Sequence, residues 1–136
     1  MIAFADTSAL YALLANDDYM HVRAKAIFES FSKQETTLVT SSYVLVETMA
    51  LIQRRLGMAA VIDFHQHIQP LLEIIWIDAD WHSRAIQRLL TIQRQKVSFV
   101  DCLSFVLMET KGIGLSFSFD SHFEEQGFAQ VAYDAP

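Results

Sequence analysis

The chain has 136 residues, of which 52% are hydrophobic and 19% are charged, and its formal net charge is −6. This length and composition exclude a disordered protein and predict one folded domain over residues 1–136, with a single substantial core. The negative charge excludes broad, charge-driven binding to nucleic acids or anionic membranes, unless bound cations offset several of the acids.

The sequence shows no segment that would direct the chain out of the cytoplasm. The N-terminus MIAFADTSAL lacks a positively charged region and is interrupted by Asp6, so it does not fit a signal peptide. No apolar run reaches the roughly 20 residues of a membrane-spanning helix. The lone Cys102 cannot form an internal disulfide, which fits a reducing compartment. We therefore expect a cytoplasmic protein with no membrane contact.

The first third of the chain predicts two strands and two helices. Residues 2–5 (IAFA) form a short apolar strand that stops at Asp6, and the DTS that follows is a good helix start because all three residue types cap helices. Residues 19–33 carry apolar side chains at helical spacing. Residues 36–41 (TTLVTS) are rich in β-branched residues and predict a second strand.

The middle of the chain predicts two helices and a third strand. A helix is expected from residues 43 to 56, where Gly57 stops it. A further helix continues to His67, and Pro70 marks its end. Residues 73–78 (EIIWID) then predict a strand.

The last third continues the same alternation. Helices are expected over residues 80–93 and 99–110, followed by a strand over 115–119 that ends at Asp120. A short turn of helix and a final strand, FAQVAY (128–133), complete the pattern. Strands separated by helices indicate βαβ units, and hence an α/β fold with a central, mainly parallel sheet flanked by helices.

Four acidic residues stand in apolar surroundings, whereas most of the sixteen lie in polar segments. Asp6 and Asp120 follow predicted strands, where parallel sheets form their sites, and Glu47 and Asp101 lie in the helical stretches YVLVETMALI and VSFVDCLSFV. Buried carboxylates are costly, and clustered ones raise one another's pKa. A hard divalent cation removes both problems, and oxygen ligands without an adjacent His or Cys cluster indicate Mg²⁺ or Mn²⁺.

Each acid also has a structural interpretation. Ser98 and Asp101 have the spacing of a capping box, and Asp6 and Asp120 could cap the turns that follow their strands. These interpretations stay open beside the metal site.

Glu47 is expected to face the core. On its helix it shares a face, at spacings of three and four, with Tyr43, Val44, Ala50 and Leu51. Arg54 lies seven residues further on the same face and could balance the charge of Glu47 as a buried ion pair.

The order of the motifs resembles that of a PIN domain. The chain has DTSAL after a short first strand, an acid in a mid-chain helix, FVDCLSFVLM, and SFDSHFEEQGF near its end. More narrowly, it resembles the VapC-type toxins of bacterial and archaeal toxin–antitoxin pairs, over the whole chain. The resemblance implies a three-layer α/β/α PIN-like fold and Mg²⁺- or Mn²⁺-dependent cleavage of phosphodiester bonds in RNA.

By this resemblance, the family's acidic quartet is matched at all four positions, by Asp6, Glu47, Asp101 and Asp120. A cation held by carboxylates polarises the scissile phosphate and lowers the pKa of the attacking water. We assign direct metal contacts to Asp6 and Asp101. Glu47 and Asp120 are expected to reach the metal through water or to orient the nucleophile.

Several other polar residues are candidates for substrate contacts. Thr7 and Ser8 offer hydroxyls and amides at a helix start, which suits a phosphate or a hydrating water. Arg94 and Lys96, in the QRQK segment before the Asp101 helix, are candidates for RNA binding. The remaining basic candidates are Arg54, Arg55, Arg84 and Arg88, of which the last two are equally well explained as a solvated helix face.

The histidines and the cysteine are expected to be structural. His65 and His67 are two residues apart on a helix and point in different directions, which disfavours a metal-binding pair. His122 is interpreted as a surface histidine in a turn, although its position close to Asp120 would let it touch substrate. Cys102 is interpreted as a small buried residue.

The sequence thus predicts a metal-dependent endoribonuclease, the toxin of a VapBC-type pair. The resemblance implies a homodimer and a VapB-type antitoxin whose C-terminal segment occupies the groove, often bringing an arginine to the acids. A non-catalytic RNA-binding or regulatory PIN module and a housekeeping RNA-processing nuclease remain as alternatives. An aspartyl-phosphate phosphatase is disfavoured, because Ser8 stands where that class needs a second Asp.

Overall fold

A five-stranded, wholly parallel sheet forms the centre of the protein, with the strand order β3-β2-β1-β4-β5. The computed structural model describes residues 1–132. The strands are β1 (Ile2–Ala5), β2 (Thr37–Ser41), β3 (Leu72–Ile75), β4 (Leu115–Phe117) and β5 (Ala129–Gln130). The parallel sheet predicted from the sequence is confirmed.

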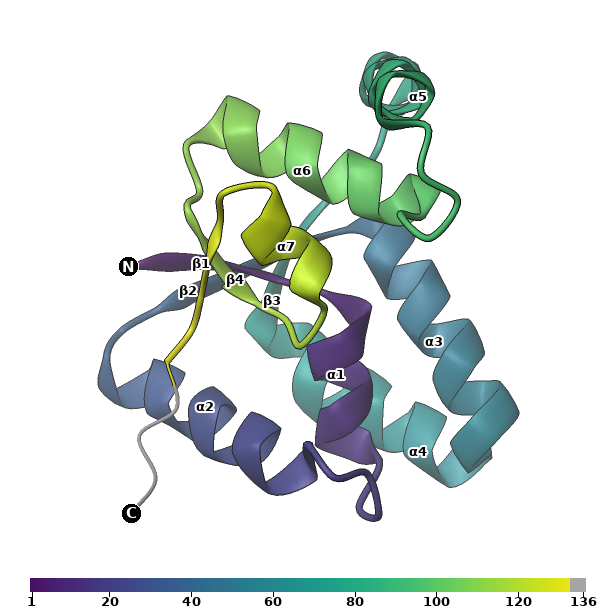
Figure 1. Ribbon diagram of the computed structural model, residues 1–136. Coiled ribbons are helices and arrows are strands. Elements are labelled where there is room, and N and C mark those ends of the chain that lie inside the picture. The colour runs from purple at the N-terminus through teal and green to yellow at the C-terminus, as the bar shows by residue number, and fades with distance from the viewer. Residues whose placement is uncertain (133–136) are drawn as a thin grey trace.

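Helices cover both faces of this sheet, as the three-layer prediction requires. Figure 1 shows α5 and α6 on one side of the sheet and α1 and α2 on the other. None of the helices in the described residues is both long and apolar enough to cross a membrane. The helices are α1 (Thr7–Leu14), α2 (His21–Lys33), α3 (Ser42–Leu56), α4 (Met58–Asp63), α5 (Ala79–Ile92), α6 (Phe99–Lys111) and α7 (Ser121–Glu125).

The most apolar segments of the sequence lie at the centre of the fold. In β1, Ala3, Phe4 and Ala5 are fully buried, because a central strand of a parallel sheet is covered on both faces. Helix α6 is buried without interruption over residues 101–108, since it lies against the sheet and carries α5 on its outer side. An acid in this helix therefore has little access to water.

Two predicted elements have different ends because side chains cap the neighbouring helices. The predicted strand 73–78 ends at Ile75, and Asp78 instead caps α5 by accepting a hydrogen bond of 2.9 Å from the Trp81 amide. The predicted strand 115–119 ends at Phe117, because the next residues form the turn into α7.

The helix predicted to reach His67 changes its geometry on the way. Helix α4 passes into a π-helical segment (Phe64–Ile68) and then into a 3-10 turn (Gln69–Leu71), which contains Pro70. The last predicted strand, 128–133, is shortened to Ala129–Gln130, and residue 133 lies outside the described residues.

An aromatic contact fixes the first turns of three helices next to one another. Tyr43 of α3 and His82 of α5 share a hydrogen bond of 2.5 Å between Oη and Nδ1. The centroid of the Phe99 ring of α6 lies 5.0 Å from the centroid of the His82 ring and 6.1 Å from that of the Tyr43 ring. These contacts hold the start of α6 in place, and Asp101 lies in that first turn.

Candidate active site

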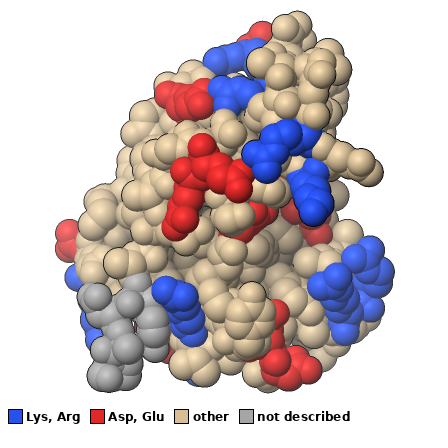
Figure 2. All heavy atoms as spheres, in the orientation of Figure 1, with Lys and Arg blue, Asp and Glu red and all other residues tan. Residues whose placement is uncertain are grey.

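The candidate site lies beyond the carboxyl ends of β1 and β4, which are neighbours in the sheet. The chain leaves β1 into α1 and leaves β4 toward α7, so the connections diverge here, as they do at the ligand sites of other parallel α/β sheets. Figure 2 shows acidic side chains in and around a hollow on this face, with basic side chains along one edge.

Asp6 is the most buried acid of the site, with only 3% of its surface exposed. It is the N-cap of α1, and its Oδ2 accepts hydrogen bonds from the Ser8 amide at 3.2 Å and the Ser8 hydroxyl at 2.8 Å. The Asp6 amide donates to the Phe117 carbonyl at 3.0 Å, which ties the carboxylate's backbone to β4. The predicted capping role is therefore real, and it leaves the other oxygen, Oδ1, available to a ligand.

Two serine hydroxyls join Asp6 to the turn that carries Asp120. The hydroxyls of Ser8 and Ser118 are 3.3 Å apart, and that of Ser118 also donates to Asp6 Oδ2 at 3.4 Å. In return, the Phe119 amide donates to Ser8 and the Asp120 amide donates to Ser118, each at 3.0 Å. Ser118 was not predicted as a site residue, although a serine two residues before an acid at a strand end is a recognisable turn signal.

We expect Ser8→Ala to destabilise the protein by about 1–3 kcal/mol, because it leaves the Phe119 amide without its acceptor. Urea unfolding measures the change. Ser30→Ala is the matched control, since the Ser30 hydroxyl only bonds back to its own helix, at the Ile27 carbonyl, and its loss should change stability by less than about 0.5 kcal/mol. Equal effects of the two variants would contradict a bridging role for Ser8.

Asp101 combines a helix cap with the candidate site. Its amide donates to the Ser98 hydroxyl at 3.0 Å and its Oδ2 accepts from the Ser98 amide at 3.4 Å, so the predicted capping box is present. The residue is only 7% exposed. Since the first turn of a helix favours negative charge, α6 partly offsets the cost of burying this carboxylate.

Asp120 and His122 border the site from the first turn of α7. Asp120 is the N-cap of α7, and its Oδ1 accepts from the His122 amide at 2.9 Å. The ring Nδ1 of His122 lies 3.1 Å from Asp120 Oδ1 and 3.3 Å from Asp101 Oδ2. The side chain of His122 is only 16% exposed, so its interpretation as a surface histidine is wrong. Its spacing from Asp120 was the signal that could have placed it in the site.

Burial and mutual repulsion make two of these carboxyl groups hard to ionise. Burial, followed by the charge of Asp101, raises the pKa of Asp6 to about 7, against the lowering effect of its Ser8 hydrogen bonds. Burial and the charge of Asp120 raise the pKa of Asp101, while hydrogen bonds from His122 and Ser98 lower it. The three acids therefore lie close enough to repel one another.

The donor atoms of this site fit a divalent cation. Within the described residues, one ligand atom from each of Asp101, Asp120 and His122 lies within 4.8 Å of the others. Asp6 adds a carboxylate that repels both acids electrostatically. A cation of charge +2 would attract these carboxylates and stabilise the ionised forms of Asp6 and Asp101. The cluster is therefore more favourable with a bound metal ion than without one.

Glu47 differs from the other three acids. It is half-buried, and it makes no hydrogen bond or ion pair with other residues in the described range 1–132. The buried face of α3 is instead formed by Ser42, Val44, Leu45, Thr48 and Ile52. The expected core position of Glu47 and its ion pair with Arg54 are therefore wrong.

Helix α3, which carries Glu47, is joined to the helix that follows Asp6. The hydroxyl of Thr48, the residue after Glu47, donates to the Thr7 hydroxyl at 3.2 Å. Thr7 is the first residue of α1 and follows Asp6 directly. The buried Thr7 hydroxyl thus holds two helices together, and its predicted substrate contact stays a prediction.

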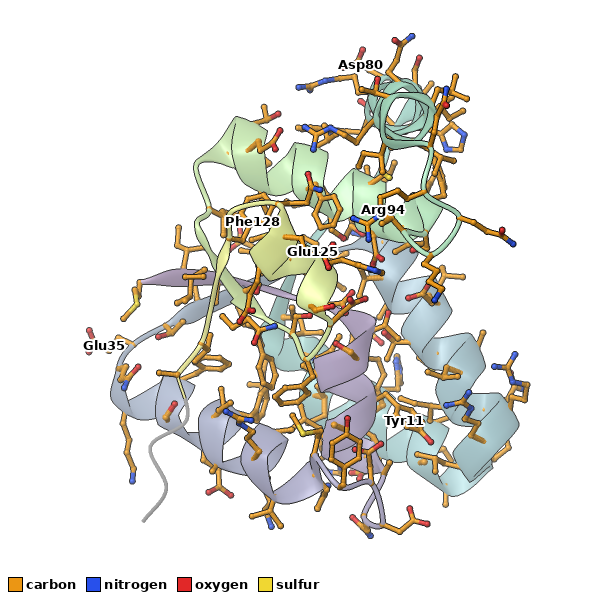
Figure 3. All side chains as sticks on the ribbon, viewed as in Figure 1. Tyr11, Glu35, Asp80, Arg94, Glu125 and Phe128 are labelled. Carbon is orange, nitrogen blue, oxygen red and sulfur yellow. The ribbon has the colours of Figure 1, made fainter. Side chains whose placement is uncertain are left out.

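Arg94, one of the two predicted RNA-binding residues, lies beside α7, which borders the site (Figure 3). Arg94 Nη1 pairs with Glu125 Oε2 of α7 at 2.9 Å, and Figure 3 shows the two side chains next to each other. Lys96 is exposed. Arg84 and Arg88 instead join α5 to α6, through Thr110 and Glu109 respectively. These two arginines are thus committed to helix packing.

The remaining candidates are structural, as expected. His65 bonds to Gln69 and His67 to Asp63, each on the exposed surface of its own helical segment. Cys102 is fully buried, and burial raises the pKa of its thiol.

Comparison with known proteins supports a nuclease site. A family model described as a PIN domain matches residues 3–129. The 23S rRNA-specific endonuclease VapC20 of Mycobacterium tuberculosis is 34% identical over 129 residues, which are 94% of this chain and 96% of that protein, in both strains CDC 1551 / Oshkosh and H37Rv.

Solved structures agree with the sequence comparison. The crystal structure of Mycobacterium tuberculosis VapC20, described as a Sarcin-Ricin loop cleaving toxin, matches with a TM-score of 0.85 and 32% identity over 96% of this chain and 98% of that one. FitAcB from Neisseria gonorrhoeae (TM-score 0.67, 97% of each chain) and PAE2754 from Pyrobaculum aerophilum (0.60, 96% and 90%) are 17% identical and share the fold. The resemblance to VapC-type toxins is thereby confirmed, and the chain belongs to the PIN-domain family.

Proposed function

We propose that this protein is a divalent-metal-dependent endoribonuclease, the toxin of a VapBC-type pair, built as a single PIN domain over residues 1–136. One observation carries the proposal. Three carboxylates from three separate segments converge beyond β1 and β4, and two of them, Asp6 and Asp101, are buried with raised pKa values. The relative at 34% identity is an endonuclease.

The acids divide into two roles according to their exposure. Asp6 and Asp101, the most buried, would hold Mg²⁺ or Mn²⁺ directly, while Asp120 and Glu47, both half-buried, would contact it through water or orient the attacking water. When bound, the ion polarises the scissile phosphate and supplies a water of lowered pKa. The Ser8 and Ser118 hydroxyls hold Asp6 against the Asp120 turn, so the carboxylates are already positioned before RNA arrives.

Arg94 and Lys96 are proposed to contact RNA phosphates. The Arg94–Glu125 pair is exposed, with side chains 51% and 42% accessible, and such pairs contribute little stability. A phosphate can therefore replace Glu125 as the partner of Arg94, and the exposed Lys96 is two residues away. The Ser8 and Thr7 hydroxyls and the Ser8 backbone amide already have partners within the protein, so any contact from these residues to a phosphate would use the backbone amide of Thr7.

The proposed partners follow from the relatives. Since VapC20 is described as specific for 23S rRNA and as cleaving the Sarcin-Ricin loop, we propose that loop as the first substrate to test. We also propose a VapB-type antitoxin, a homodimer and a cytoplasmic location, as expected from the sequence.

The experiment is a cleavage assay on RNA with controlled metal. Purified protein, freed of any partner, is incubated with total bacterial RNA and with a Sarcin-Ricin loop oligonucleotide, in Mg²⁺, in Mn²⁺ or in EDTA. We expect cuts at discrete positions in both metals and none in EDTA, because the buried acids repel substrate phosphate without a cation.

Two outcomes would contradict the proposal. Cleavage that persists in EDTA would remove the metal from the mechanism. No cleavage in any arm, together with no metal binding by calorimetry, would favour the non-catalytic RNA-binding module. Cuts in total RNA but not in the oligonucleotide would keep the nuclease and reject the substrate.

A further inference from the structure

The ring of His122 occupies a position between two acids of the proposed metal site. Its Nδ1 lies 3.1 Å from Asp120 Oδ1 and 3.3 Å from Asp101 Oδ2, and its side chain is 16% exposed. The backbone fixes this position, because Asp120 caps α7 and accepts a hydrogen bond from the His122 amide at 2.9 Å. The ring is thus held against the acids by the same turn that supplies one of them.

Two of the distances between these atoms are close to the edge of a coordination octahedron. With metal–ligand distances of about 2.1 Å, two adjacent ligands of an octahedral ion are about 3.0 Å apart. The two contacts of Nδ1 are close to that length, and all three ligand atoms lie within 4.8 Å of one another. A cation placed between the carboxylates would therefore meet the nitrogen with small adjustments of the side chains.

A nitrogen ligand changes which ion the site prefers. Mg²⁺ is a hard ion that favours oxygen, whereas imidazole suits first-row transition metals, for which affinity rises from Mn²⁺ onward. We propose that His122 is a direct metal ligand through Nδ1, beside the directly bound carboxylate of Asp101, and that this mixed nitrogen and oxygen set makes the site selective for Mn²⁺ over Mg²⁺. This inference rests on the proposed metal-dependent function and specifies its cofactor.

A hydrogen-bonding role is the competing explanation, since a protonated Nδ1 would also lie at these distances from two carboxylates. The two roles require different groups: a hydrogen-bonding role needs an N–H donor, whereas a metal ligand needs a nitrogen that can coordinate the ion. A hydrogen-bond donor can be supplied by the side-chain amide of Asn, whose nitrogen corresponds to Nδ1 of His, but an amide nitrogen does not ligate metals. The variant His122→Asn therefore keeps the donor and removes the nitrogen ligand.

The test uses Mn²⁺ alone as the probe and needs no RNA. Pulsed electron paramagnetic resonance of the Mn²⁺-loaded protein detects the nuclear coupling of a directly bonded ¹⁴N, and calorimetry gives the affinities for Mn²⁺ and Mg²⁺. We expect nitrogen coupling in the wild-type protein and none in His122→Asn. The variant should lose Mn²⁺ affinity about 10- to 100-fold and Mg²⁺ affinity less than about 3-fold.

The control is His67→Asn, because His67 contacts only Asp63 on the exposed surface of its helical segment. This variant should keep the nitrogen coupling, and thermal unfolding should show that both variants remain folded. Mn²⁺ binding without nitrogen coupling, or coupling that survives in His122→Asn, would overturn the ligand role while leaving the nuclease intact. Failure of the wild-type protein to bind Mn²⁺ or Mg²⁺ would overturn the proposed function as well.

Discussion

Replacing Asp101 with Asn is expected to lower the rate of RNA cleavage about 10³-fold while the protein stays folded. A metal-bound carboxylate contributes several kcal/mol to stabilising the transition state, and about 4 kcal/mol corresponds to this factor. The fold should survive, because the Asn side-chain oxygen can still accept the Ser98 amide hydrogen bond and the Ser98 hydroxyl keeps its own partner. The measurement is the single-turnover cleavage rate in saturating Mg²⁺ or Mn²⁺.

Glu109→Gln is the matched control for this variant. It removes one charge from the same helix, at an exposed residue that pairs with Arg88 and lies outside the site. Cleavage by the control should equal that of the wild-type protein. If Asp101→Asn retained more than about a tenth of the wild-type rate, a direct metal contact for Asp101 would be rejected, because such a loss corresponds to less than about 1.4 kcal/mol.

Replacing Asp6 with Asn is expected to stabilise the metal-free protein at pH 8, by up to about 4 kcal/mol. In the folded protein the pKa of Asp6 is about 7, against 3.8 for the free side chain, so the folded state binds this proton more tightly. Below about pH 4 the group is protonated in both states and costs nothing. As the pH rises from 4 to 7 the stability falls, and above 7 the whole penalty applies.

The Asn variant cannot ionise, so it should lack this loss of stability between pH 4 and 7, and its oxygen can still accept the Ser8 hydrogen bonds. Urea unfolding in EDTA at pH 5 and pH 8 measures the difference. Asp17→Asn, at an exposed acid, is the control and should leave the pH dependence unchanged. A variant less stable than the wild-type protein by the same amount at both pH values would contradict the raised pKa. Adding Mg²⁺ should restore stability at pH 8 only where Asp6 is present.

The sequence could predict the sheet and the convergence of three of the four acids, because both depend on local patterns. Short apolar runs that end in Asp marked β1 and β4, and the topology of a parallel sheet then places Asp6 and Asp120 at one edge. Asp101 was recognisable as an acid within an otherwise apolar helix, α6. The structure shows that all three acids cap helices, and because each capping hydrogen bond uses one oxygen of the carboxylate, capping does not exclude the proposed site.

The remaining features depend on three-dimensional contacts that local patterns do not contain. Glu47 was expected in the core because it shares a broad helix face with apolar residues. The rotation of α3 about its axis is instead set by buried residues such as Thr48, which contacts α1. His122 was expected on the surface because turns usually are, but α7 directs its ring toward Asp101, 21 residues away in sequence. Ser118 gains its role in the site through Ser8 and Asp6, which lie 110 and 112 residues earlier in the chain.

The long-range bridge between Ser8 and Ser118 also has a consequence for how the chain is synthesised. Strand β1 is made early, but its neighbour β4 and the turn that carries Asp120 are made only after α6. Asp6 therefore has neither its serine bridge nor its full set of partner acids until those later segments have been made. A nascent chain therefore cannot assemble the proposed site until these later segments have been made, so the order of synthesis itself delays the appearance of any activity.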